Sequence, residues 1–132
     1  MSDTENKQPS DDSHWEHRSD QRFVDYYAEA SQSPETMARF GSVMEKLLAI
    51  LGPERATETL SVADVGCGAG VQAMMWAGKG HDVHGLDVNS GLIELATSRA
   101  AGADLNVDFR VGTATDLPWS DASMDICLLP EL

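Results

Sequence analysis

Three glycines at alternate positions follow a short apolar run near the middle of the 132-residue chain. The segment reads Asp64-Val65-Gly66-Cys67-Gly68-Ala69-Gly70. Glycines at this spacing after a strand allow a tight turn and let a ligand approach the backbone closely. The free amide groups at the start of a following helix would favour a carboxylate or phosphate beside that turn. The segment therefore predicts a strand, a ligand-binding turn and a helix.

Strand and helix patterns alternate along the second half of the chain. We predict strands at residues 60–65, 81–87, 107–111 and 124–129, and helices at residues 71–77 and 91–101, the second capped by Asn89 or Ser90. Strands that alternate with helices of about ten residues form βαβ units. The predicted fold class is therefore α/β, with a parallel sheet whose carboxyl strand ends share one edge, where ligands of such folds bind.

Residues 23–58, which precede this α/β part, have a helical pattern. Ser33 suits an N-cap position and Pro34 suits the first helical position. Apolar residues then recur every three or four positions, as expected of a helix with one buried face. We expect Gly52-Pro53 to end this helix.

Residues 1–22 contain Trp15 but no aliphatic residue after the initiator methionine. Such a segment buries too little apolar surface to offset its ordering entropy, so we expect a disordered acidic tail. His14 and His17 could share a helix face within it, but two histidines without a third ligand do not predict a metal site.

Composition excludes several classes of function. The chain has 22 acidic and 9 basic residues, a formal net charge of −13, which argues against nucleic acid or an anionic membrane as partner. It has no apolar run of the ~18 residues that a membrane span needs and no signal-peptide pattern, so we expect a cytoplasmic protein. Cys67 and Cys127 are too few for a disulfide framework or a structural zinc site. The acid excess fits a solvated acidic surface or a salt-rich cytoplasm equally well.

A second candidate position is Asp87, at the end of the second predicted strand and about 20 residues beyond the glycine turn, where a carboxylate can accept both hydroxyls of a ribose. Asp87 could instead cap the next helix, although Asn89 is better placed for that. Asp64 could contact a ligand or bind a neighbouring loop. The dinucleotide fingerprint would need glycine at Val71, and no G-K-[S/T] tripeptide is present. A nicotinamide-dependent oxidoreductase is therefore a less favoured interpretation.

Together with Gly112-Thr113-Ala114-Thr115-Asp116-Leu117-Pro118-Trp119, followed by Asp121, Ser123 and Asp125, these segments resemble class I S-adenosylmethionine-dependent methyltransferases. The resemblance runs from about Leu60 to Leu129 and is greatest to the small-molecule branch of ubiquinone- and menaquinone-type enzymes (methyltransferase type 11). It implies a Rossmann-like fold, strand order 3-2-1-4, S-adenosylmethionine as cofactor and a small-molecule methyl acceptor. Family members have further strands. Residues 59–132 are therefore expected to be the cofactor-binding half of a C-terminally incomplete domain, either part of an enzyme or an inert cofactor-binding fragment.

The resemblance also implies a set of cofactor-binding residues. They are Asp64, Gly66, Cys67, Gly68, Ala69, Gly70, Asp87, Val88, Thr113 and Ala114. The glycine turn would line the methionine moiety, with Asp64 reaching its amino group. Asp87 would hold the ribose, and Val88 would pack on the adenine. Thr113 stands where the family usually has an aspartate that accepts from the adenine amino group, and Ala114 would offer its backbone N–H.

No catalytic base and no metal ligand can be chosen from the sequence. The displaced group is an activated sulfonium, so the family mechanism needs a base only when the acceptor is poorly ionised. His81 and His84 lie in or beside the second predicted strand, which is expected to face helices, and are expected to be structural.

Overall fold

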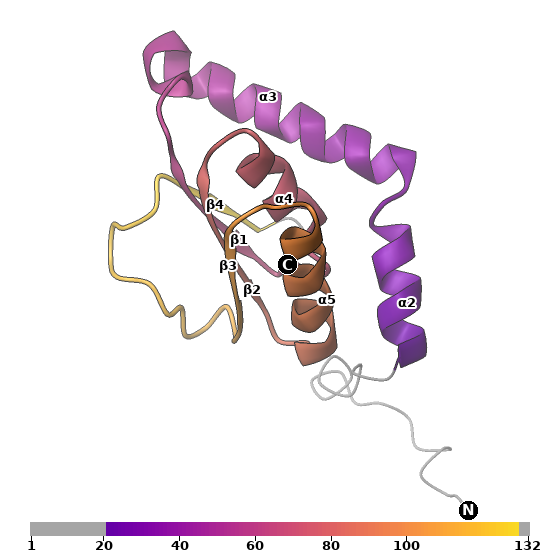
Figure 1. Ribbon diagram of the computed structural model, residues 1–132. Coiled ribbons are helices and arrows are strands. Elements are labelled where there is room, and N and C mark those ends of the chain that lie inside the picture. The colour runs from indigo at the N-terminus through magenta and orange to yellow at the C-terminus, as the bar shows by residue number, and fades with distance from the viewer. Residues whose placement is uncertain (1–20, 130–132) are drawn as a thin grey trace, which may run out of the picture.

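The computed structural model describes residues 21–129 of the chain (Figure 1). The elements in chain order are α2 (Gln21–Ala30), α3 (Pro34–Ala56), β1 (Ser61–Val65), α4 (Val71–Gly78), β2 (Asp82–Asp87), α5 (Ser90–Gly102), β3 (Val107–Val111) and β4 (Ile126–Leu128). The histidine pair of the predicted tail, His14 and His17, lies outside the described residues. Helix α2 begins at Gln21, slightly before the start predicted for the helical segment.

The four strands form one parallel sheet in the order β3-β2-β1-β4, which confirms the predicted α/β fold and strand order. In the register of β1 and β2, Val62 lies beside Val83 and Val65 beside Leu86. The glycine turn after β1 and Asp87 at the end of β2 therefore lie at the same edge of the sheet. This edge holds the candidate site.

The long helix α3 begins as the sequence predicts. The Ser33 side chain caps it by accepting from the amide of Thr36. Gly52, with φ 90° and ψ 163°, interrupts the helix at the predicted point, but helical backbone resumes and continues to Ala56. The predicted end is therefore right for the long helix, and a further helical turn follows because a proline directly after the break has the φ value that starts a helix.

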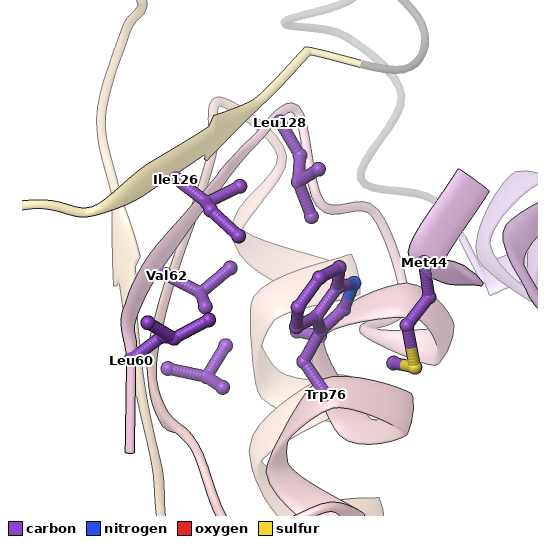
Figure 2. Packing of buried hydrophobic residues seen from close by; sticks show 8 residues of the cluster. Met44, Leu60, Val62, Trp76, Ile126 and Leu128 are labelled. Atoms are coloured by element: carbon purple, nitrogen blue, oxygen red, sulfur yellow. The ribbon is translucent and has the colours of Figure 1, made fainter. Parts of the chain in front are cut away.

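Trp76 of α4 is at the centre of the core. Figure 2 shows its ring between Val62 and Ile126 of two neighbouring strands on one side and Met44 of α3 on the other. The ring is fully buried. Removing a side chain of this size from water contributes on the order of 4–6 kcal/mol. This packing fixes α4, and with it the glycine turn, against the sheet.

A second cluster joins α2 to the site. Val24 and Ala28 of α2 are buried against Ala69 of the glycine turn and Leu92 of α5. The chain segment that precedes the α/β part therefore covers the turn directly. The site thus lies beneath a helix that is distant in sequence.

Residues 112–125 form a long loop that extends on the side of the sheet away from α2 (Figure 1). Asp125 anchors its end, because its carboxylate accepts from the backbone amide of Ser61 at 2.8 Å and from the guanidinium of Arg55 at 3.0 Å. The strand that follows is shorter than predicted and runs from Ile126 to Leu128. Within the described residues, no helix has the length and apolar character of a membrane span.

The two histidines near β2 have structural contacts. The His81 ring accepts from the Leu60 amide at 3.1 Å and packs against Trp76. His84 lies between Asp82 and Asp108, at 3.3 and 3.2 Å. Because its strand neighbour Val83 packs under α4, His84 is on the opposite face of the sheet. The contacts of both histidines agree with the expected structural role, and the face of the strand that holds Val83 packs against a helix as predicted.

Candidate functional site

The glycine turn has a backbone that other residues rarely adopt. Gly66, Gly68 and Gly70 have φ values of 79°, 57° and 87°, in the left-handed region. A Cβ on Gly70 would also lie only 2.8 Å from the ring of Phe109. The amides of Gly66 and Cys67 both donate to the carbonyl of Leu86, at 2.7 and 2.9 Å. The turn is thus held against β2 and cannot relax around a side chain at position 70.

Asp64, just before this turn, is a buried carboxylate. Its exposed fraction is 0%, and neither of its oxygens has a hydrogen-bond partner among the described residues. Burial, together with the nearby charge of Asp87, raises the pKa of Asp64 to about 7, against a smaller opposing effect of the backbone amide of Ala73. Buried carboxylates are nearly always paired. An unpaired one beside a ligand-binding turn indicates that a cation or a donor belongs there.

Asp87 links the two strand ends. One carboxylate oxygen accepts from the Gly68 amide at 2.8 Å, and the other accepts from the Asn89 amide at 2.9 Å. Partial burial raises its pKa, although these amides oppose the rise. Asn89 itself caps α5 by accepting from Leu92, so the alternative role of Asp87 as cap of that helix is excluded. A carboxylate has about four acceptor positions, so Asp87 can still accept from a ligand.

A cavity of about 310 Å³ lies between the glycine turn and the helices α2 and α3. Its floor includes four of the predicted site residues, which are Asp64, Gly66, Cys67 and Ala69. Helices α2 and α3 provide the opposite wall, with Tyr26, Tyr27, Thr36, Arg39 and Phe40. The Tyr27 ring comes within 3.1 Å of the position that a Cβ on Gly68 would occupy. The wall therefore touches the turn itself.

The predicted adenine contacts lie apart from this cavity. Val88, Thr113 and Ala114 are exposed and do not line it. The Thr113 hydroxyl accepts from the amide of Thr115 at 3.1 Å and lies 2.7 Å from the Thr115 hydroxyl. Much of the hydrogen-bonding capacity predicted for Thr113 is therefore used within its own loop.

Sequence reasoning missed Gln72 and the wall provided by α2 and α3. Gln72 is 3% exposed, and its side-chain nitrogen has no hydrogen-bond partner among the described residues. Its signal was present in the sequence, since it is a long polar side chain inside the apolar helical stretch VQAMMWAG. Tyr27 left no such signal, because its contact with Gly68 joins segments some forty positions apart.

Nothing in the described residues adds a metal or a nucleophile to the site. No group of three or more histidine, cysteine or acidic side chains is placed to hold a metal ion. Cys67 lines the cavity, but burial and the charges of Asp64 and Asp87 raise its thiol pKa far above the usual value. The thiol therefore stays protonated and unreactive.

Comparison with known proteins points to one family. A family model described as "Methyltransferase domain" matches residues 62–132. A ubiquinone biosynthesis O-methyltransferase of Sinorhizobium fredii is 40% identical over 73 residues, which are 55% of this chain and 29% of that protein. This chain therefore spans less than a third of the length of that relative.

Solved structures that resemble this chain include a methyltransferase. A SAM-dependent methyltransferase of Methanosarcina mazei is 35% identical with a TM-score of 0.50, over 54% of this chain and 36% of that one. A protein of Methanococcus maripaludis aligns over 82% of this chain and 48% of its own, with a TM-score of 0.62 and 20% identity, and shares the fold.

Proposed function

The chain belongs to the methyltransferase-domain family, the class I S-adenosylmethionine-dependent methyltransferases that its sequence predicts, and on that premise we propose its function. It binds S-adenosylmethionine at the carboxyl ends of β1 and β2 and presents the methyl group to a small-molecule acceptor. The observation that carries this proposal is the buried, unpartnered carboxylate of Asp64 beside the glycine turn.

The residues at this edge fit the cofactor. The ammonium of its methionine moiety would pair with Asp64, and the opposite charge would offset the cost of burying that carboxylate. The remaining acceptor positions of Asp87 suit the hydroxyls of a ribose. Left-handed glycines at positions 66, 68 and 70 leave the turn without side chains that would block a close approach.

The chemistry of the cofactor is a methyl group on a sulfonium, which is already activated for displacement. The protein then contributes mainly alignment of donor and acceptor and a cavity with little water. The wall from α2 and α3, with Tyr27 and Phe40, serves both purposes. No lining residue is assigned as a general base, which an acceptor with an ionised oxygen does not need.

A small-molecule acceptor with a nucleophilic oxygen is supported by the relative from Sinorhizobium fredii, which is named for O-methylation in ubiquinone biosynthesis. The acidic composition supports a protein without a nucleic-acid partner, and we also propose that it is cytoplasmic. The alternative function is cofactor binding without transfer.

Calorimetric titration with S-adenosylhomocysteine and, separately, with NAD tests the binding step. We expect the first ligand to bind at a ratio of one to one and NAD not to bind, since Val71 replaces the glycine of the dinucleotide fingerprint. NAD binding tighter than S-adenosylhomocysteine would contradict the proposal. Transfer of a labelled methyl group to small-molecule acceptors that carry a hydroxyl group then separates an enzyme from a protein that only binds the cofactor.

A further inference from the structure

Gln72 is a second buried polar group in the cavity that holds Asp64. It is the second residue of α4, it is 3% exposed, and its side-chain nitrogen has no hydrogen-bond partner among the described residues. Buried amide donors are almost always bonded, because leaving one unpaired costs the free energy of its lost hydration. Two residues that line this cavity therefore carry unpaired polar atoms, a donor on Gln72 and acceptors on Asp64.

The start of α4 adds further donors near Gln72. Gly70 occupies the N-cap position and provides no side-chain cap for the first-turn amides of this helix. The positive end of the helix dipole favours an anionic group at this point. Asp64 is the acidic residue that lines the cavity, and it can only accept while ionised. The cavity is thus suited to a ligand that carries a cation and an anion side by side.

We propose that Gln72 determines cofactor specificity by donating a hydrogen bond from its side-chain nitrogen to the α-carboxylate of the methionine moiety, while Asp64 holds the ammonium. The inference rests on the proposed function and extends it to a residue outside the glycine turn. It makes the cavity a receptor for a zwitterionic α-amino acid group.

A neutral donor suits position 72 better than a charged one. A lysine or arginine there would pair with the buried Asp64 and remove the acceptor that the ammonium needs. A glutamate would repel both Asp64 and the ligand carboxylate. The cavity does have one cationic residue, Arg39, but it is exposed and stands over the ring of Phe40 at 5.4 Å. Gln72 is the buried donor.

Titration with two ligands tests the inference. S-adenosylhomocysteine carries both charges, and its decarboxylated analogue keeps the ammonium but lacks the carboxylate. We expect Gln72→Met, which preserves side-chain length, to weaken S-adenosylhomocysteine about 10- to 100-fold and to leave the analogue within about twofold. Gln72→Glu should weaken S-adenosylhomocysteine at least as much, through repulsion. The matched control is Gln32→Met, on the exposed turn between α2 and α3 and outside the cavity.

The outcomes are distinct. If both variants weaken the two ligands equally, or weaken neither, Gln72 does not contact the carboxylate and the inference is wrong. If the unaltered chain binds neither ligand, the proposed function fails before Gln72 is tested. Thermal unfolding of each variant without ligand checks the fold, and either variant alone gives the comparison if the other does not fold.

Discussion

The two ends of the predicted cofactor site differ in how firmly the fold holds them. At the methionine end, residues 64–72 are mostly buried between β1, α4 and α2, and their turn is bonded to β2. At the adenine end, the Gly112 amide donates to the Asp87 carbonyl at 3.0 Å, but residues 113 and 114 are exposed, and the bonds of Thr113 to described residues lie within its own loop. The buried backbone therefore builds the first end along its whole length, whereas at the second end the bond to β2 stops at Gly112 and the predicted contacts depend on exposed residues.

Substituting one glycine at each end tests whether the fold holds the two ends differently. Gly70→Ala places a side chain at φ 87° and 2.8 Å from the Phe109 ring, so we expect a loss of about 2–4 kcal/mol in the free energy of unfolding. Gly112→Ala has no such backbone strain but meets the end of the buried Leu86 side chain, also at 2.8 Å, so it should cost less, about 1 kcal/mol. Urea unfolding monitored by circular dichroism measures both.

Gly78→Ala is the matched control for this pair. Its Cβ would enter open space at the end of α4, so it should be neutral or slightly stabilising. Equal losses for the variants at positions 70 and 112 would show that the two ends are held alike.

Asp87, which lies between the two ends, should have the next largest effect. Asp87→Ala removes the charged acceptor that we propose for the ribose hydroxyls, so affinity for S-adenosylhomocysteine should fall by about 1.5–3 kcal/mol, or roughly 10- to 100-fold. It also frees the amides of Gly68 and Asn89, so Asp87→Asn separates the lost charge from the altered turn. Calorimetry measures the affinities, with Asp82→Ala, an exposed residue at the other end of β2, as control. Unchanged affinity in both variants would remove Asp87 from the site.

Thr113→Asp should increase the affinity for the cofactor at the adenine end by a small amount. A carboxylate has two oxygens, so one can accept from the Thr115 amide while the other accepts from the adenine amino group. We expect severalfold tighter binding of S-adenosylhomocysteine in a calorimetric titration. Thr115→Asp, two residues along the same exposed loop, controls for added charge. Weaker binding in the Thr113 variant would mean that this loop does not reach the adenine.

Sequence patterns predicted the elements that local chemistry dictates. The glycine turn, the four strands and the cap of α5 at Asn89 each depend on residues within a few positions of one another. What was missed depends on distant contacts, as with Tyr27 above Gly68. The resumed helix after Gly52 was missed because the same glycine-proline pair can end a helix or only bend it. The hydrogen bonds between Thr113 and Thr115 were also not predicted, because loop contacts have no periodic signature.

Asp64 should make the free energy of unfolding depend on pH. Its pKa in the folded chain, about 7, lies above the ordinary value of 3.8, so its protonated form favours the fold. The stability that it contributes is fully present below about pH 4 and is lost as pH rises through 7. Without ligand, the difference in unfolding free energy between the unaltered chain and Asp64→Asn should therefore change across this range and level off above it. A difference that does not vary with pH would place the carboxylate in water.

Proton release on ligand binding tests the central claim, that buried Asp64 accepts the ammonium of the cofactor. An ammonium beside Asp64 favours the ionised carboxylate, so binding near pH 6.5 must expel the proton that the free site holds. Titrating S-adenosylhomocysteine in two buffers with different ionisation enthalpies measures that proton directly. The account predicts release of a substantial fraction of one proton at pH 6.5, little at pH 8.5, and none from this group in Asp64→Asn. Binding with no proton release at either pH, and with the same affinity in the Asn variant, would contradict it.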